Sequence, residues 1–182
     1  MVLLGAAPSM ATTFEKVTTA DLADRAERVV VVKCESCRAE RDRRSGLVYT
    51  RVRLSLLEAL KGAPSGSTIE LRLVGGEADG VRTVVAGMPV FQAGEECVLL
   101  LGKRNAAGHP TLLAARRGRI RLVRDKTGGR FLRDSVSGFG EMKRARGGVE
   151  LAAFRTAYRA TMKAKAKKRA EAATRKTKDG SK

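Results

Sequence analysis

The chain has 182 residues, with 37 Lys and Arg against 19 Asp and Glu, and a formal net charge of +18. This length allows one domain with a sizeable core plus extensions. Tryptophan is absent, and only two tyrosines and five phenylalanines are present, so the chain offers few aromatic platforms of the kind that single-strand nucleic-acid binders use. Net charge alone therefore does not indicate a nucleic-acid-binding protein.

Residues 1–11 resemble the last part of a secretory signal peptide. They begin with an apolar run, and small residues at Ser9 and Ala11 precede the polar Thr12, which is the order found at signal peptidase sites. We therefore expect an exported protein, secreted or periplasmic. The run is short and has no basic beginning, so this expectation requires a start site further upstream; otherwise we expect a cytoplasmic protein. No stretch approaches the roughly 20 apolar residues of a transmembrane helix.

Residues 12–148 are predicted to form a mainly β domain. A short helix that Thr18 caps, with Asp21 three positions on, ends at about Glu27. Apolar or alternating segments between glycine turns then predict strands, at 29–32 with an extension toward Cys37, 47–60, 68–74, 81–85, 97–101, 111–115, 119–124 and 130–133. The charged segment 38–46 is expected to be an exposed loop. Short strands at regular spacing predict a small antiparallel β-barrel, closed or nearly closed.

Strand 97–101 is almost purely aliphatic, so it is expected to be buried on both faces or to lie at the centre of a barrel. Before it, Pro89 has no N–H to donate and interrupts the ladder. Glu95 and Glu96 precede the strand. They are expected to be exposed turn charges, because adjacent residues of a strand point to opposite faces and do not share a site easily.

The C-terminal region is predicted to contain an amphipathic helix over residues 149–162. Leu151, Phe154 and Tyr158 recur at helical spacing and are expected to pack on the barrel. Residues 163–182 form a tail rich in Lys and Ala, and the last 22 residues of the chain carry nine basic and two acidic side chains. Like charges at i, i+4 oppose the helical preference of Ala and Lys. We expect this tail to be disordered or a fraying helix.

Five short motifs follow one another in the body of the chain, at 49–50 (YT), 57–62 (LEALKG), 75–77 (GGE), 87–91 (GMPVF) and 94–101 (GEECVLLL). Together with a valine-rich strand after a short helix, they resemble a group of exported bacterial proteins of unassigned function, over roughly residues 17–160. More distantly, Leu-Lys-Gly at a strand end and Gly-Glu before an aliphatic strand are similar to netrin-like modules. Those modules are oligonucleotide/oligosaccharide-binding-type (OB-type) barrels and include the tissue inhibitors of metalloproteinases.

The netrin-like resemblance implies a barrel fold but not inhibition of metalloproteinases. Those inhibitors place a free N-terminal cysteine on the protease zinc, and no cysteine lies near Met1 or Thr12. The disulfide framework of animal netrin modules is missing as well. A likeness at the level of the fold supports architecture better than activity.

Cys34 and Cys37 form a CxxC pair, a candidate disulfide or thiol pair. An exported chain could form this disulfide or one with Cys97, and an incidental pair is the alternative. A structural zinc needs four ligands, and Cys97 and His109 are the only other cysteine and histidine. His109 is expected to lie in an exposed loop. We assign no catalytic residue, metal site or cofactor, and we expect the chain not to be an enzyme.

Two groups of basic residues, one in the body and one in the tail, are candidates for binding a polyanion. The alternative for the body group is a solvated outer face of the barrel, and the alternative for the tail group is a solubilising extension. In the body, alternation is expected to place Arg117, Arg119 and Arg121 on one strand face, with Arg124 nearby. The tail candidates are Lys163, Lys165, Lys167, Lys168, Arg169, Arg175 and Lys176. We expect a binding module for an unknown protein or envelope polyanion, tethered by its tail; the alternative is a cytoplasmic nucleic-acid-associated protein that binds through both groups.

Overall fold

The computed structural model describes residues 17–62, 66–142, 144–145 and 148–179, so the predicted signal segment 1–11 lies outside the described residues. The helices in this part of the chain are α1 (Thr19–Arg25), the 3₁₀ helix η1 (Ala115–Gly118) and α2 (Leu151–Asp179). The strands are β1 (Arg28–Arg41), β2 (Val48–Lys61), β3 (Thr68–Val74), β4 (Gly76–Ala78), β5 (Val81–Thr83), β6 (Glu96–Arg104), β7 (Pro110–Leu112), β8 (Arg119–Arg124), β9 (Arg130–Leu132), β10 (Arg144–Ala145) and β11 (Gly148–Glu150).

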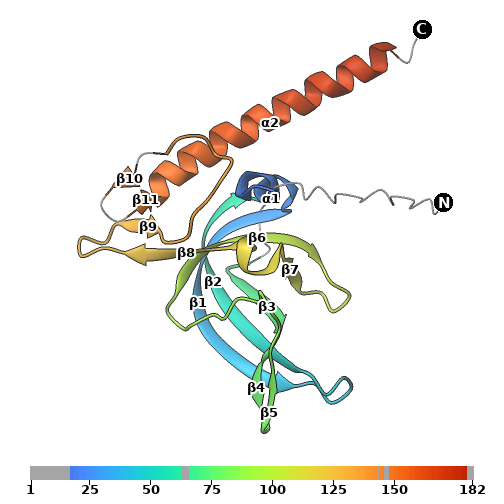
Figure 1. Cartoon of the computed structure of the whole chain (residues 1–182), viewed down its shortest axis with the longest axis vertical. Helices are drawn as coiled ribbons and strands as arrows, with labels where there is room; N and C mark the ends of the chain where they lie inside the picture. The colour runs from blue at the N-terminus through green and yellow to red at the C-terminus, as the bar shows by residue number, and fades with distance from the viewer. Residues whose placement is uncertain (1–16, 63–65, 143, 146–147, 180–182) are drawn as a thin grey trace, which may run out of the picture.

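Nine of the described strands form one antiparallel sheet, in the order β10-β11-β9-β8-β6-β1-β2-β3, with β7 paired to β6 (Figure 1). The mainly β class with a short N-terminal helix and a C-terminal helix is therefore confirmed. The predicted barrel is wrong, because the sheet is open: within the described residues β3 and β10 end the strand order and do not pair with each other. At the β10 end, β11 leads directly into α2, which packs beside β9 and β11.

Residues 29–32 of β1 and 97–101 of β6 are buried on both faces, which explains their continuous apolar sequences. Val29 and Val31 contribute to a core that includes residues of α1 and α2, whereas Val30 and Val32 contribute to a second core with residues of β2 and β3. The five side chains of 97–101 are fully buried and alternate between the same two cores. The predicted double burial of this strand is confirmed.

Several segments differ from the predicted elements; for example, the predicted strand 81–85 ends at Thr83, and the short strands β4, β10 and β11 were not predicted. Two of the differences have a clear local cause. Strand β1 continues to Arg41, so the first half of the predicted loop 38–46 pairs with β2, and the carboxylate of Asp42 accepts backbone hydrogen bonds that close the hairpin. Register shifts along β1 bend this long hairpin. The predicted strand 111–115 ends at Leu112, because Ala114 and Ala115 have positive φ, which an extended strand does not accommodate.

The base of α2 packs as predicted for an amphipathic helix. Phe154 is fully buried, and its ring lies edge-on to Phe139, with centroids 5.2 Å apart. Tyr158 completes the cluster at 6.2 Å from both rings. Together with Leu151 these aromatic side chains attach α2 to the core that α1 also covers.

Beyond the predicted end at residue 162, α2 continues as a helix to Asp179 and extends away from the sheet (Figure 1). Lys165 and Arg169 form ion pairs with Asp21 and Asp24 of α1. These contacts place two cations of the predicted tail next to acids of the body, which offsets the repulsion along the helix. No helix within the residues that the structure describes is long and apolar enough to cross a membrane.

Candidate functional site

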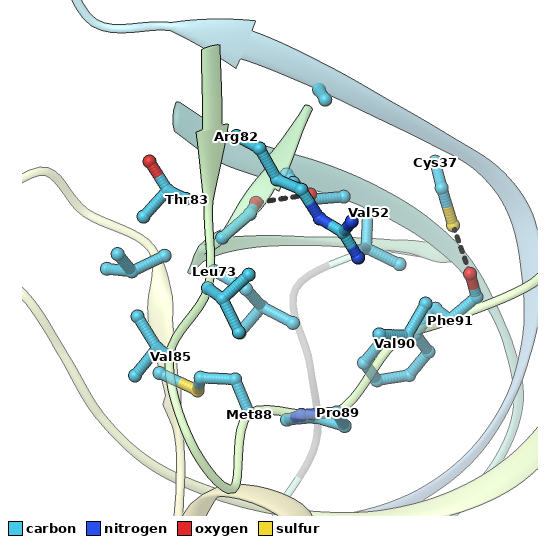
Figure 2. Close-up of a pocket in the computed structure, with 16 residues that line it drawn as sticks. Cys37, Val52, Leu73, Arg82, Thr83, Val85, Met88, Pro89, Val90 and Phe91 are labelled. Atoms are coloured by element: carbon cyan, nitrogen blue, oxygen red, sulfur yellow. Dashed lines mark hydrogen bonds between the residues drawn. The ribbon is translucent and has the colours of Figure 1, made fainter. Parts of the chain in front are cut away.

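A pocket of about 380 Å³ lies beside β2 and β3, under the segment that connects β3 to β6. Its lining is mostly apolar. Figure 2 shows Val52 and Leu73 of the sheet facing the side chains of the connecting segment, of which Val85, Met88, Pro89, Val90 and Phe91 are labelled. Volumes of this size and apolar walls are typical of sites for small molecules.

Two glycines direct the connecting segment over the sheet. Gly75 and Gly76 have φ values of +121° and +130°, which L side chains rarely adopt. A Cβ at Gly76 would lie 2.7 Å from Oγ1 of Thr50, and that hydroxyl donates a 2.7 Å hydrogen bond to the carbonyl of Gly75. Glycine is therefore required where the chain leaves β3 and forms the β4–β5 hairpin across β2.

Arg119 holds the opposite wall of the pocket in place. Its side chain is buried; Nη1 donates a 2.6 Å hydrogen bond to the carbonyl of Val90 and lies 3.1 Å from a carboxylate oxygen of Glu95. The guanidinium carbon also lies 4.9 Å from the centre of the Phe91 ring. A cation stacked on an aromatic ring and bound to a backbone carbonyl fixes the path of residues 90–91.

The mouth of the pocket carries apolar side chains that are exposed to solvent. Val84 and Val90 are 77% and 79% exposed, and Val85 is 39% exposed. These residues flank the glycine and proline of segment 87–89, outside any strand. Val84 and Val85 are followed closely by Gly87 and Pro89, which interrupt strand pairing. Apolar residues at such a break cannot be buried within a regular sheet, so this sequence pattern could have indicated the site. Exposed apolar side chains that gather around a pocket indicate an interaction site.

One cysteine of the CxxC pair, Cys37, lies at the edge of the same pocket. Cys34 and Cys37 are free thiols whose sulfur atoms are 3.3 Å apart. Cys37 is exposed, lines the pocket, and donates a hydrogen bond to the carbonyl of Phe91 (Figure 2). Burial raises the pKa of the Cys34 thiol to about 12, and burial also raises the pKa of Cys97. The exposed thiol is thus the accessible one of the three.

The four arginines predicted as a basic face do not share one open surface. Arg117 belongs to η1 rather than to a strand, and its side chain donates to a backbone carbonyl. Arg119 is buried as described above. Arg121 is paired with Asp134 at 2.7 Å, and Arg124 is paired with Glu96. Acidic neighbours therefore offset three of these four charges.

Glu95 and Glu96 are not the exposed turn charges that were expected. Their side chains are only 17% and 10% exposed, and each forms an ion pair with an arginine of β8. The pairing of β6 with β8 brings the two sets of charges together. The acidic pair thus has a structural partner that lies far away in the sequence.

The tail candidates divide into two sets on α2. Lys165 and Arg169 contact α1, as described above, whereas Lys163, Lys167 and Lys168 are exposed. Arg175 and Lys176 lie in the last turns of the helix, and their side chains lie outside the described part of the chain.

His109 is half-buried rather than fully exposed, and its Nδ1 lies 3.9 Å from a carboxylate oxygen of Glu70. Among the described residues, no group of three or more His, Cys, Asp or Glu side chains is placed to hold a metal ion.

Comparison with models of protein families finds no match, and a search of curated proteins finds no significant match. The resemblance to exported bacterial proteins and to netrin-like modules therefore stays a prediction.

Proposed function

We propose that this chain is a non-enzymatic binding module of the cell envelope, held against an anionic surface by helix α2. One observation carries this proposal: α2 extends beyond the sheet (Figure 1), and basic side chains along one side of it are exposed. Arg159, Lys163 and Lys167 are all exposed, and their spacing of four residues places them on one face of the helix. Glu171 continues this face and lies 3.8 Å from Nζ of Lys167, but both side chains are exposed, so solvent weakens their pairing.

The other face of α2 sets the direction of this cationic stripe. Helical geometry puts Lys165 and Arg169 on the same side as Phe154 and Tyr158, and their ion pairs with α1 hold that side toward the body. The stripe of Arg159, Lys163 and Lys167 therefore points away from the domain. A helix whose outward face carries basic side chains can lie along a flat anionic surface such as a layer of acidic lipid headgroups.

Nucleic acid is the alternative ligand for the same cations. It would be expected to use the arginines of β8 as well, but Arg119, Arg121 and Arg124 are engaged by carboxylates. This arrangement favours the lipid surface, because the arginines of β8 do not join the helical stripe in a broad basic groove.

The test compares two triple variants of the full chain that lose the same charge. One is Arg159→Ala/Lys163→Ala/Lys167→Ala, on the stripe. The control replaces three exposed arginines of the β1–β2 hairpin, Arg38→Ala/Arg43→Ala/Arg44→Ala, of which the first lies on β1 and the other two lie in the turn. Binding to vesicles of phosphatidylglycerol is measured by co-sedimentation at increasing salt, with phosphatidylcholine vesicles as the neutral surface.

Each cation near an anionic surface contributes about 1 kcal/mol, so the stripe variant should lose roughly 100-fold in affinity. The hairpin control should keep most of its binding, and salt should weaken the unchanged chain. Equal losses in both variants would refute a specific role for α2. Binding to duplex DNA that depends on the stripe, without binding to acidic vesicles, would favour the nucleic-acid alternative.

A further inference from the structure

We infer that the pocket beside β2 and β3 binds a linear acyl carboxylate, with the hydrocarbon chain between the apolar walls and the carboxylate on Arg82. This site lies away from α2 and does not depend on the surface tether proposed above. Its support comes from the charge, the lining and the accessibility of the pocket.

Arg82 is the charged side chain that lines this pocket in the described part of the chain. It projects from β5 over the pocket, above Val52 and Leu73 (Figure 2). Its guanidinium forms no ion pair within 4 Å with any described residue, including Glu77, its neighbour across the β4–β5 hairpin. An arginine without a carboxylate partner beside an apolar cavity is suited to bind a carboxylate with both of its nitrogen donors.

The remaining polar side chains of the lining already have partners. The hydroxyl of Thr50 donates to the carbonyl of Gly75, and the hydroxyl of Thr83 accepts a 3.0 Å hydrogen bond from the backbone N–H of Val48. The thiol of Cys37 donates to the carbonyl of Phe91. The pocket therefore offers one anion-binding group and otherwise apolar surface, which matches a ligand with one carboxylate and a hydrocarbon body, such as an acyl chain.

The mouth of the pocket is compatible with such a chain. Val84, Val85 and Val90 are exposed around it, and a bound hydrocarbon would cover part of this surface. Burial of apolar surface then adds to the charge-assisted contact with Arg82. A ligand that lacks the carboxylate should gain the burial of apolar surface but not the contact with Arg82.

The experiment uses dodecanoate as the probe, at concentrations below those at which it forms micelles, with dodecan-1-ol and dodecylamine as the uncharged and cationic counterparts. Binding to the full reduced chain is measured by calorimetry. The reaction of Cys37 with a thiol reagent is followed in parallel, because a ligand in the pocket should shield this thiol. We expect dodecanoate to bind about tenfold more tightly than the alcohol and to slow the reaction of Cys37 at saturation.

Two pairs of variants test the assignment. Arg82→Gln should lose about tenfold in affinity for dodecanoate and none for dodecan-1-ol, whereas Arg53→Gln, an exposed arginine outside the pocket lining, should bind as the unchanged chain does. Val90→Glu adds a carboxylate at the mouth and should weaken dodecanoate by a similar factor. Leu57→Glu is its control, because Leu57 is exposed but does not line the pocket.

Equal binding of dodecanoate and dodecan-1-ol would overturn the role of Arg82. Binding that leaves the reactivity of Cys37 unchanged would place the ligand elsewhere and refute the site. The stripe variant of α2 should bind dodecanoate normally, so a failure of the tether and a failure of this pocket are distinguishable.

Discussion

Replacing Arg119 by methionine should destabilise the domain strongly, because this change leaves a charge without its partner. The Arg119 side chain is 8% exposed and that of Glu95 is 17% exposed. Methionine has an apolar side chain of related length that can still contact Phe91. Arg119→Met removes the cation and the hydrogen bond to the carbonyl of Val90. It also leaves the carboxylate of Glu95 largely buried and without its cation.

Removal of one partner from a buried ion pair costs about 3–5 kcal/mol, whereas removal of both can be nearly neutral. The Nε atom of Arg119 is buried and has no hydrogen-bond partner among the described residues, so the pair is incompletely satisfied even when intact. The double variant Arg119→Met/Glu95→Gln should therefore recover a large part of the loss. Its interaction energy should be about 1–3 kcal/mol in a double-mutant cycle.

Urea unfolding followed by far-UV circular dichroism measures both quantities; fluorescence is less suitable because the chain has no tryptophan. For a urea dependence of about 2 kcal/mol per molar, the single variant should lower the midpoint by roughly 2 M. A loss of less than about 1 kcal/mol in the free energy of unfolding of Arg119→Met would refute the expected contribution of this ion pair to stability. A double variant as unstable as the sum of the single variants would contradict the proposed coupling.

Three further predictions concern the helices and the thiols. Phe154→Ala should cost about 3–5 kcal/mol by urea unfolding, because it leaves a cavity in a fully buried site; a cost below 1 kcal/mol would show that α2 is not attached through this cluster. The hydrogen bond from Lys165 holds the pKa of Asp21 well below its usual range. At a pH above the usual aspartate pKa of about 3.9, this contact therefore stabilises the folded state in full. The stabilisation is lost progressively as the pH falls from that value toward the lower pKa of the folded state. The melting temperature should therefore decrease between pH 4 and pH 2 more in the unchanged chain than in Lys165→Met, and equal slopes would contradict this assignment. In the reduced protein at pH 8, one thiol should react promptly with a thiol reagent, and Cys37→Ser should abolish that fast phase; fast reaction of a second thiol would show that Cys34 is more accessible than the structure indicates.

The local patterns of the sequence predicted most of the strands. The valines of 29–32 and the aliphatic run 97–101 indicate burial on both faces, and the structure places their residues alternately in two cores. Alternation likewise predicted segments 47–60 and 68–74, since each strand presents one apolar face. These predictions succeed because the period of apolar side chains depends only on the conformation of the strand itself.

The same patterns could not predict which elements meet. The sheet is open rather than a barrel, and this depends on the pairing of β3 with β2 and on the packing of α2 beside β9 and β11. Closure is decided by contacts between residues far apart in the chain, and a strand with one apolar face has the same sequence pattern in either architecture.

The charges show most clearly what only the tertiary structure decided. Arg119 alternates with apolar residues along its strand and so resembles an exposed side chain, but the pairing of β6 with β8 places it against Glu95 and Phe91 and buries it. Lys165 likewise has the sequence context of a disordered tail, until α1 brings Asp21 next to it. By itself, the sequence determined the periodicity of apolar side chains, a local property. The tertiary structure determined which charges have an ionic partner and which, such as Arg82, have none among the described residues, because electrostatic partners are set by distance in space rather than by separation along the chain.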